Sequence, residues 1–443
     1  MTTTPPAARS EPYGRIRLAF GLSLLVAAPA LWVRLSEPHL SHGIEAVLFG
    51  LAIVGAAFVL SWAAEVAQLD IAAGLALALL ALIAVLPEYA VDFVFAWQGG
   101  HSVALYGPSC PSPEGLASPC SLALANMTGA NRLLIGIGWS SVVFIAWWRS
   151  RRPRPDGTPP QPVSEVVLAR PHAVEIAFLL VATGYSLTLP LKHSITLIDS
   201  LILVGLFVLY MVRLSRAPAG EPHLVGPARW IGSFPTRRRR ITVVAMFAWA
   251  AFVIVLCAEP FAHALVSAGR DYGVSEFFLV QWLAPLASEA PEFIVAGLFA
   301  WRLQTDTALG ALVSSKVNQW TLLVGSLPLV FAIASKSLHG LPIAGSQRLE
   351  LLLTAAQSLF AVALISNLRM SIREAWWIFG LFFVQFIASV VAGEHLHEEF
   401  LVATSAVYLI VGCWLLVQHR MAVAALVRDG FRAPYEELTA EGP

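Results

Sequence analysis

Two pairs of acidic residues lie in stretches that are otherwise strongly apolar. Glu88 and Asp92 are four residues apart, and Glu289 and Glu292 are three apart, with Ser288 beside them. On a helix these spacings place each pair on one face. An ionised side chain at the centre of a bilayer is unfavourable by roughly 2.5–3.5 kcal/mol, so such acids usually pair or line a water-filled cavity. We therefore expect these carboxyl groups to face one another and to hold cations or protons.

A polar segment follows each acidic pair along the chain. In the segment 306–334, Ser315 and Gln319 share a helical face and flank Lys316. Its counterpart in 121–147 holds Asn126, Thr128, Gly129, Asn131 and Arg132. Because hard cations prefer carboxylate, hydroxyl and amide oxygens, these segments predict the second wall of a cation site, with more ligands from 306–334 than from 121–147.

Lys316 is the residue that most restricts which ions the predicted site can bind. Beside glutamates, a buried lysine either neutralises one of them as a fixed ion pair or releases its proton when a cation arrives. Lys316 and Asp92 are therefore the candidates for proton coupling. The alternative is that Lys316 and Arg132 extend toward the interface or hold helices together.

The acidic pairs belong to an internal repeat. Residues 87–97 carry Pro-Glu-Tyr, then Val, then Phe-Ala-Trp, and residues 291–301 carry Pro-Glu-Phe, then Val, then Phe-Ala-Trp, at a constant offset of 204 residues. Pro87 and Pro291 each remove a backbone donor, which predicts a helix break beside the following carboxylate. An ordinary proline kink is the alternative.

The composition places these segments in a membrane. The 443 residues are 57% hydrophobic and 13% charged, which is more apolar surface than a soluble domain buries. The net charge is zero, so nothing favours nucleic acid as a partner. Windows of about 20 residues predict twelve membrane helices near 16–34, 43–65, 71–97, 121–147, 172–191, 195–213, 241–266, 275–301, 306–334, 349–367, 374–392 and 399–418.

Lysine and arginine set the expected orientation, because basic residues stay on the cytoplasmic side. With both termini inside, the cytoplasmic segments hold 21 basic residues and the outer segments hold 5. The helix containing Glu88 then runs outward and the helix containing Glu292 runs inward, so the repeats are inverted, as in many secondary transporters. We expect a multi-pass protein of the cell inner membrane.

Two of the four cysteines fall in a predicted outer loop. Cys110 and Cys120 lie in the segment 98–120, where a disulfide can persist. A bridge that closes this loop and two free thiols are both compatible with the sequence. Cys257 and Cys413 lie in apolar helices and are expected to pack there.

The repeat segments resemble the sodium/calcium exchanger superfamily, the cation/calcium antiporters. Those proteins carry Gly-Thr-Ser-Leu-Pro-Glu on one helix and Gly-Asn-x-x-Gly-Ser-Asn-x-x-Asn/Asp on the next. Here residues 84–88 read Ala-Val-Leu-Pro-Glu and residues 288–292 read Ser-Glu-Ala-Pro-Glu. Residues 125–131 read Ala-Asn-Met-Thr-Gly-Ala-Asn, and residues 310–316 read Gly-Ala-Leu-Val-Ser-Ser-Lys.

The resemblance implies a ligand set and a domain plan. Glu88 and Glu292 would hold the metal cation as the central carboxylates. The other positions that match family ligands are Ser288, Glu289, Ser315 and Gln319. The plan is an all-α protein with two inverted five-helix repeats, divided into a tail and extra helix (1–42), a first repeat (43–213, motifs 84–98 and 121–138), a basic linker (214–240), a second repeat (241–392, motif 287–325) and a last helix and tail (393–443).

This sequence also departs from the family pattern. The matching positions of the first half, which lack oxygen side chains, are Ala84, Val85, Ala130 and Leu134. Lys316 stands where the family has asparagine. These departures point away from standard sodium/calcium exchange.

We expect a secondary cation antiporter that exchanges sodium or calcium for protons. Its partners would be the lipid bilayer and small inorganic cations, without a cofactor. Two alternatives stay open. A calcium/cation exchanger that tolerates the substitutions predicts saturable calcium uptake, and a sensor or scaffold that has lost transport predicts no flux.

Other classes fit less well. The sequence has no phosphate-binding glycine-rich loop and no catalytic-triad spacing, so neither an ATPase nor an enzyme is expected. The acidic and histidine cluster at 394–399 falls in a predicted outer loop, with histidines two residues apart, which is a weak metal signal.

Overall fold

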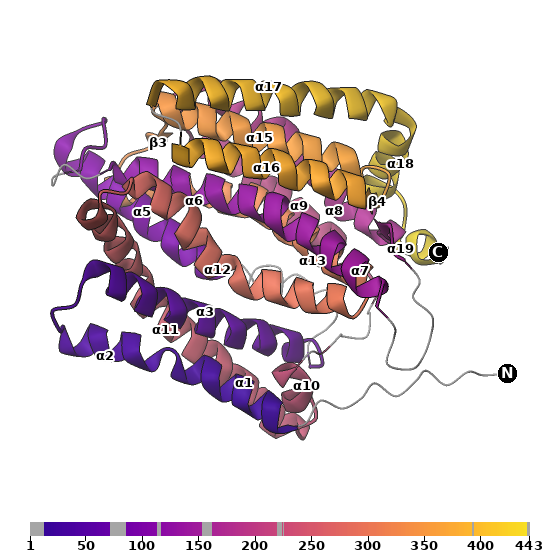
Figure 1. The fold of residues 1–443 in the computed structure, drawn as a ribbon, viewed down its shortest axis with the longest axis horizontal. Helices are drawn as coiled ribbons and strands as arrows, with labels where there is room; N and C mark the ends of the chain where they lie inside the picture. Colours follow the sequence, from indigo (N-terminus) through magenta and orange to yellow (C-terminus); the bar gives the residue numbers. More distant parts are fainter. Residues whose placement is uncertain are drawn as a thin grey trace.

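Long helices lie side by side with roughly parallel axes (Figure 1). This computed structural model describes residues 13–70, 86–112, 117–152, 162–218, 224, 226–391 and 394–440. The all-α membrane architecture expected from the sequence is confirmed. The helices up to the basic linker are α1 (Tyr13–Leu25), α2 (Ala28–Ser36), α3 (His42–Ala67), α5 (Leu86–Tyr106), α6 (Pro119–Leu133), α7 (Ser140–Ser150), α8 (Ala173–Ser186) and α9 (Leu197–Leu214).

The second part of the chain continues in the same style. Its helices are α10 (Pro227–Gly232), α11 (Thr236–Tyr272), α12 (Glu276–Trp301), α13 (Thr305–Asn318), α14 (Val324–Ser335), α15 (Gly345–Ile365), α16 (Ile372–Val391), α17 (Glu394–Gln418), α18 (Arg420–Phe431) and α19 (Tyr435–Ala440). The described strands are short: β1 (Glu165–Val167), β2 (Ser194–Ile195), β3 (Leu341–Pro342) and β4 (Arg369–Ser371).

Eleven helical stretches of the described chain are long and apolar enough to span a membrane. They correspond to eleven of the twelve expected helices. The twelfth, expected at 71–97, lies partly outside the described residues, and α5 is its described part. The eleven are Gly14–Ser36, His42–Ala67, Pro119–Ser150, Arg170–Leu191, Leu197–Leu214, Thr236–Tyr272, Glu276–Trp301, Thr305–Ser335, Gly345–Ile365, Ile372–Ser389 and Glu398–Gln418.

Some expected boundaries were wrong. The helix α11 starts at Thr236, inside the expected linker, and continues until Gly273 adopts a positive φ of 64° that ends it. The segment 394–399, expected to be a loop, forms the first turns of α17.

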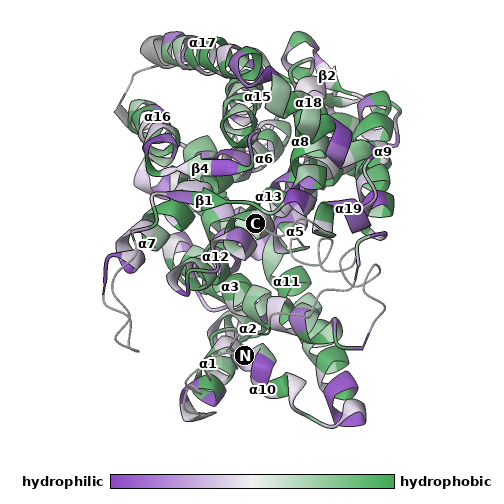
Figure 2. Ribbon diagram, turned by 90° about the vertical axis from the view of Figure 1, so that its right-hand side faces the viewer, coloured by the Kyte–Doolittle hydropathy of each residue, from purple (hydrophilic) through white to green (hydrophobic). Residues whose placement is uncertain are grey.

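The surface of the bundle suits a lipid environment. Figure 2 looks along the helices and shows hydrophobic residues on the peripheral helices as well as on the central ones. Large apolar side chains are exposed on several helices, including Val255 and Ile410. Because a contiguous apolar surface of this kind is rare on soluble monomers, the bundle is a membrane-spanning unit.

The inversion of the two repeats is visible in two short β-ladders. The strand β1 pairs with β4, and β2 pairs with β3, both antiparallel. The helix α8 leads from β1 to β2, whereas its counterpart α15 leads from β3 to β4. Equivalent helices therefore run in opposite directions between the same two ladders.

The loop between α5 and α6 is closed by a disulfide between Cys110 and Cys120. Of the two interpretations of these cysteines, the bridge is the one the structure bears out. Cys257 is buried, as expected for a packing residue, whereas Cys413 is exposed on the helix surface.

An ion pair joins the end of α3 to the beginning of α11. The Arg239 guanidinium donates two hydrogen bonds to Asp70, of 2.8 and 2.9 Å, and Arg240 donates another. The hydrogen bonds from Arg239 lower the pKa of Asp70 to about 2. A carboxyl group with a lowered pKa stabilises the fold above its ordinary pKa, and this contribution is lost as the pH falls toward 2.

The proline prediction for the second repeat was wrong. The helix α12 continues through Pro285 and Pro291 without interruption. Membrane helices tolerate proline where neighbours accommodate the freed carbonyl groups. The carbonyl of Gln281, whose usual donor would be the missing N–H of Pro285, lies directly against Gly129 of α6. An added Cβ on Gly129 would lie 1.7 Å from that oxygen.

We expect Gly129→Ala to destabilise the protein, because the two backbones would have to move apart. Overpacking of this kind lowers the free energy of unfolding by about 1–3 kcal/mol. Thermal unfolding of the detergent-purified protein measures the effect. The matched control is Gly184→Ala on α8, where no atom lies within 4 Å of an added Cβ. Equal melting temperatures for the two variants would contradict this account.

Candidate functional site

Three glutamates from different parts of the chain form a buried group, here called the carboxyl cluster: Glu88 on α5, and Glu289 and Glu292 on α12. Glu88 and Glu289 are each 2% exposed, and Glu292 is partly buried. Gln319 donates a 3.0 Å hydrogen bond to Glu88 and a second one to Glu289. Ser315 donates to Glu292 at 2.8 Å. The structure therefore brings together five of the predicted site residues.

The members of the cluster also contact one another. The carboxyl group of Glu289 lies within hydrogen-bonding reach of both Glu88 and Glu292. Within the described residues, Oε1 of Glu88, Oε2 of Glu289 and Oε1 of Gln319 are buried without a hydrogen-bond donor. Buried acceptors normally have a partner. These oxygens are thus available to a proton or a cation.

The elements that carry these side chains have an unusual backbone. The helix α13 passes into a π-helical segment, Gln319–Leu323, and α6 passes into another, Leu134–Trp139. The two segments begin at repeat-equivalent positions, 185 residues apart. Single π-helical turns are rare and occur often at functional sites. The segment Gln319–Leu323 starts at Gln319, the residue that bonds to two members of the carboxyl cluster.

Asp92 lies next to the cluster with a partner of its own. It is fully buried on α5, one turn beyond Glu88, and accepts a 2.8 Å hydrogen bond from Asn126 of α6. The second carboxyl oxygen of Asp92 and the amide oxygen of Asn126 have no donor within the described chain. This pair forms a second oxygen-lined position beside the cluster.

Lys316 is fully buried and points toward the first repeat. Its ammonium donates to Asn131 of α6, at 2.5 Å to Oδ1 and 3.1 Å to the backbone carbonyl. It also lies 4.6 Å from the centre of the Trp320 ring, a cation–π distance. The charges of Glu88 and Glu289 act on the ammonium. The lysine therefore lies beside the carboxyl cluster rather than at the interface with water.

Ser288 behaves differently from the other predicted ligands. Its hydroxyl donates to backbone carbonyls of its own helix, at 3.3 Å to Ala284 and 3.2 Å to Pro285. It is buried at the level of Glu289, and its role as a ligand stays a prediction.

The first repeat contributes fewer oxygens, as the sequence indicated. Ala130 and Leu134 are buried on α6 and its π-helical continuation, and neither offers a side-chain oxygen. Ala84 and Val85 lie outside the described residues. The side-chain oxygens of the cluster therefore come mostly from the second repeat, and Glu88 is the main contribution from the first.

A buried ion pair away from the carboxyl cluster was missed by the sequence reasoning. Arg132 is 2% exposed and pairs with Glu350 of α15 at 2.6 Å. Gln281 donates to the same carboxylate at 3.1 Å, and the guanidinium lies 5.1 Å from the Trp282 ring centre. Glu350 lies near the start of the helix that the sequence predicts. A carboxylate at that position is expected to be in contact with water. Arg132 thus holds helices together, which was one of its two open interpretations.

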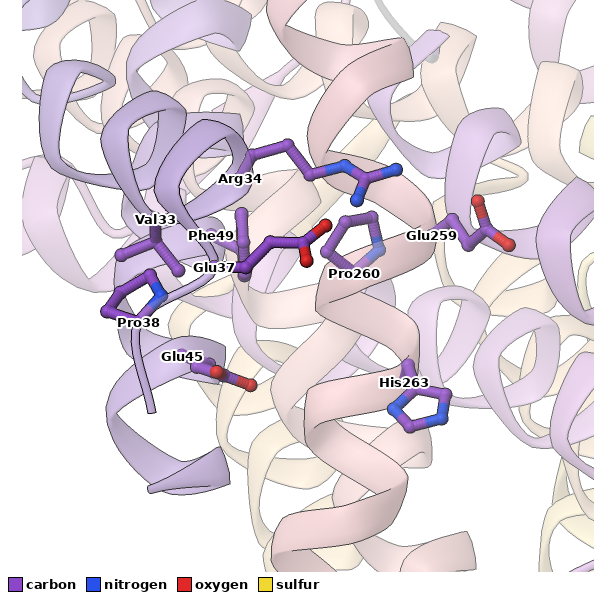
Figure 3. Close-up of a pocket in the computed structure, with 9 residues that line it drawn as sticks. All are labelled: Val33, Arg34, Glu37, Pro38, Glu45, Phe49, Glu259, Pro260 and His263. Atoms are coloured by element: carbon purple, nitrogen blue, oxygen red, sulfur yellow. The ribbon is translucent and has the colours of Figure 1, made fainter. Parts of the chain in front are cut away.

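A separate cavity lies away from the cluster. It has a volume of about 380 Å³ and lies between α2, α3 and α11 (Figure 3). Its lining residues are Val33, Arg34, Glu37, Pro38, Glu45, Phe49, Glu259, Pro260 and His263. None of them belongs to the carboxyl cluster. In the described residues no three His, Cys, Asp or Glu side chains are arranged so that they could hold a metal ion.

Comparison with known proteins shows which family profile and which solved structures this chain is similar to. The sequence profile described as sodium/calcium exchanger protein matches residues 42–216 and 242–392. The crystal structure of an H+/Ca2+ exchanger, CAX, is similar with a TM-score of 0.84 and 38% identity, over 95% of this chain and 99% of that one. The structure of native YfkE has a TM-score of 0.57 and 14% identity, over 84% and 99%, and this likeness shows the fold alone.

A known protein of Alkalimonas amylolytica, "Putative antiporter CaxA", is 27% identical over 86 residues. The matched region is 19% of this chain and 27% of the length of that relative.

The Arg132–Glu350 pair yields a stability prediction. We expect Glu350→Gln to lower the free energy of unfolding by about 3–5 kcal/mol, because it leaves a buried guanidinium without its countercharge. The double variant Arg132→Met with Glu350→Gln should lose less than the two single variants together, as thermal unfolding in detergent would show. The control is Glu165→Gln, whose partner Arg369 is exposed, and which should have almost no effect. Additive losses would contradict the pairing.

Proposed function

The chain belongs to the sodium/calcium exchanger protein family, since the family profile matches well over half of it, and we propose that it exchanges calcium for protons. In this proposal Glu88, Glu289 and Glu292 hold either a calcium ion or protons. Ser315 and Gln319 add neutral oxygens, and Lys316 supplies a built-in positive charge.

The observation that carries the proposal is the contact of the Glu289 carboxyl group with those of both Glu88 and Glu292, in a site that is mostly buried. Three neighbouring carboxylates cannot all stay ionised in a buried site without compensation, because their repulsion and desolvation add up. Protons can neutralise them, and so can a cation. Since both occupy the same oxygens, binding of one displaces the other, and this competition is what couples the two fluxes.

The formal charge of the cluster suits a divalent ion. Three ionised glutamates together with a protonated Lys316 leave a net charge of minus two. The donor atoms are carboxylate, amide and hydroxyl oxygens, the ligands that calcium prefers. The unpartnered oxygens of Glu88, Glu289 and Gln319 support this assignment.

The location of the cluster suits alternating access. It joins α5 of the first repeat to α12 and α13 of the second, and inverted-repeat transporters bind their substrates at such an interface. Asp92 adjoins the cluster and is proposed to carry a proton to or from Glu88. The similarity to an H+/Ca2+ exchanger at 38% identity supports calcium and protons as the exchanged pair.

The orientation follows from the distribution of basic residues. We place the protein in the cell inner membrane with both termini in the cytoplasm. The N-terminal end of α1 and the short helix α19 then lie on the same side, at the end of the bundle where β1 and β4 pair (Figure 1). The disulfide-closed loop between α5 and α6 lies at the opposite end.

The first test is calcium-dependent proton movement in proteoliposomes, with sodium, potassium and manganese as competing candidates. We expect calcium uptake to drive proton release, and Glu292→Gln to abolish it, because the variant cannot release a proton or offer a charge. Glu165→Gln, on the surface strand β1, is the control and should transport normally. No ion-dependent flux in the wild type would contradict the antiport assignment.

Lys316→Asn tests the built-in charge. Removing the ammonium raises the net negative charge of the site to three, so the variant should change its ion preference or its ratio of protons to calcium. The measurement is the pH change per calcium taken up under matched gradients. A ratio and a preference identical to the wild type would show that Lys316 is structural only.

Binding provides a readout that does not depend on turnover. Calcium at a concentration one hundred times its Kd should stabilise the detergent-purified protein by about 2.7 kcal/mol. The melting temperature should rise on calcium addition and fall back with a chelator. In Glu289→Gln this rise should shrink strongly. An equal rise in the variant would place the calcium elsewhere.

A further inference from the structure

Asn131 and Lys316 occupy equivalent positions of the two inverted repeats. Each lies three residues before the π-helical segment of its repeat, which begins at Leu134 in one case and Gln319 in the other. In this part of the repeats the sequence offset between equivalent positions is 185 residues, for Asn131 and Lys316 as for Leu134 and Gln319. Their mutual hydrogen bond therefore joins the two repeats where equivalent positions meet.

The amide of Asn131 is oriented for this contact. Its Nδ2 donates to the carbonyl of Met127 on its own helix at 2.8 Å, which turns Oδ1 toward the lysine. The backbone carbonyl of Asn131 accepts from the same ammonium. Both residues are fully buried. Asn131 thus offers two neutral oxygens to one buried cation.

The ammonium has a competing destination. The charges of Glu88 and Glu289 attract it, and Gln319, one turn further along from Lys316, already bonds to both carboxyl groups. Nevertheless, within the described part of the chain, the hydrogen bonds of Lys316 go to Asn131 and not to a carboxylate. A lysine released from Asn131 would pair with the carboxyl cluster, since a buried charge seeks its countercharge.

We propose that Asn131 is a positioning residue: it keeps the Lys316 ammonium beside the carboxyl cluster but off its oxygens, and thereby sets the apparent affinity for the transported cation. The inference rests on the proposed antiport. Without this hold, the lysine acts as a tethered competitor of the incoming cation. The effect is on binding, so the maximal rate changes little.

The test is the calcium dependence of uptake in proteoliposomes at one fixed pH. Asn131→Leu keeps the branched shape of the side chain and removes Oδ1 together with Nδ2, so the KM for calcium should rise about tenfold or more, the factor expected for a lost hydrogen bond to a charged group. The kcat should stay within about twofold. Asn131→Ala provides a second variant of smaller volume and should give the same split between KM and kcat.

The decisive comparison uses Lys316→Asn as background. If Asn131 acts through the lysine, adding Asn131→Leu to Lys316→Asn should leave the KM of that single variant unchanged. An equal rise of KM in both backgrounds would overturn the inference. The control is Thr354→Val, which removes a buried hydroxyl bonded only to its own helix at Glu350 and should behave like wild type.

The same experiments separate this inference from the function on which it rests. A wild-type protein that transports calcium while Asn131→Leu and Asn131→Ala match it would overturn the inference alone. A wild-type protein that neither transports calcium nor gains thermal stability from it would overturn both. An increased KM with an unchanged kcat, absent in the lysine-free background, would establish the positioning role.

Discussion

The amide of Gln319, shared between Glu88 and Glu289, is the interaction on which the arrangement of the site depends. It links a carboxylate of the first repeat to one of the second, deep in a region where ionised groups are unfavourable. A neutral donor can bring two acids together without cancelling their charge, and it leaves one oxygen of each acid unpartnered. The remaining charge must then be balanced by whatever enters the site, and this requirement connects the packing of the bundle to ion exchange.

The scaffold holds this bridge through backbone features rather than through additional polar side chains. A π-helical segment begins at Gln319, and an equivalent segment in the first repeat begins three residues after Asn131. The helices α6 and α12 approach closely because Gly129 has no side chain to separate it from the Gln281 carbonyl. Inverted repeats thus produce a similar frame twice, and the two copies face each other around the carboxyl cluster.

The side chains placed on this symmetric frame are not symmetric. The second repeat carries Glu289, Glu292, Ser315 and Gln319, whereas the first adds Glu88 and, nearby, the Asp92–Asn126 pair. Lys316 reaches across to Asn131, so one repeat lends a positive charge to a position formed by the other. The Arg132–Glu350 pair neutralises itself a short distance away and adds no net charge to the site. Within the described residues around the site, the acids without a countercharge at hydrogen-bonding distance are therefore those of the carboxyl cluster and the neighbouring Asp92.

The sequence by itself determined the membrane class, the helices, the inverted repeat and the acids at its centre, because hydropathy and residue spacing are local quantities that survive without tertiary contacts. It also indicated that Ser315 and Gln319 share a face. Only the tertiary structure decided which partners these groups have. The hydroxyl of Ser288 bonds to its own helix, Lys316 bonds to Asn131 instead of a glutamate, and Arg132 has a countercharge in Glu350, 218 residues later in the chain. The sequence likewise did not show that α12 continues through two prolines. This continuity depends on neighbouring helices, which accommodate the freed carbonyl groups. Pairing energies in a buried site depend on distance and burial, and neither can be read from residue order.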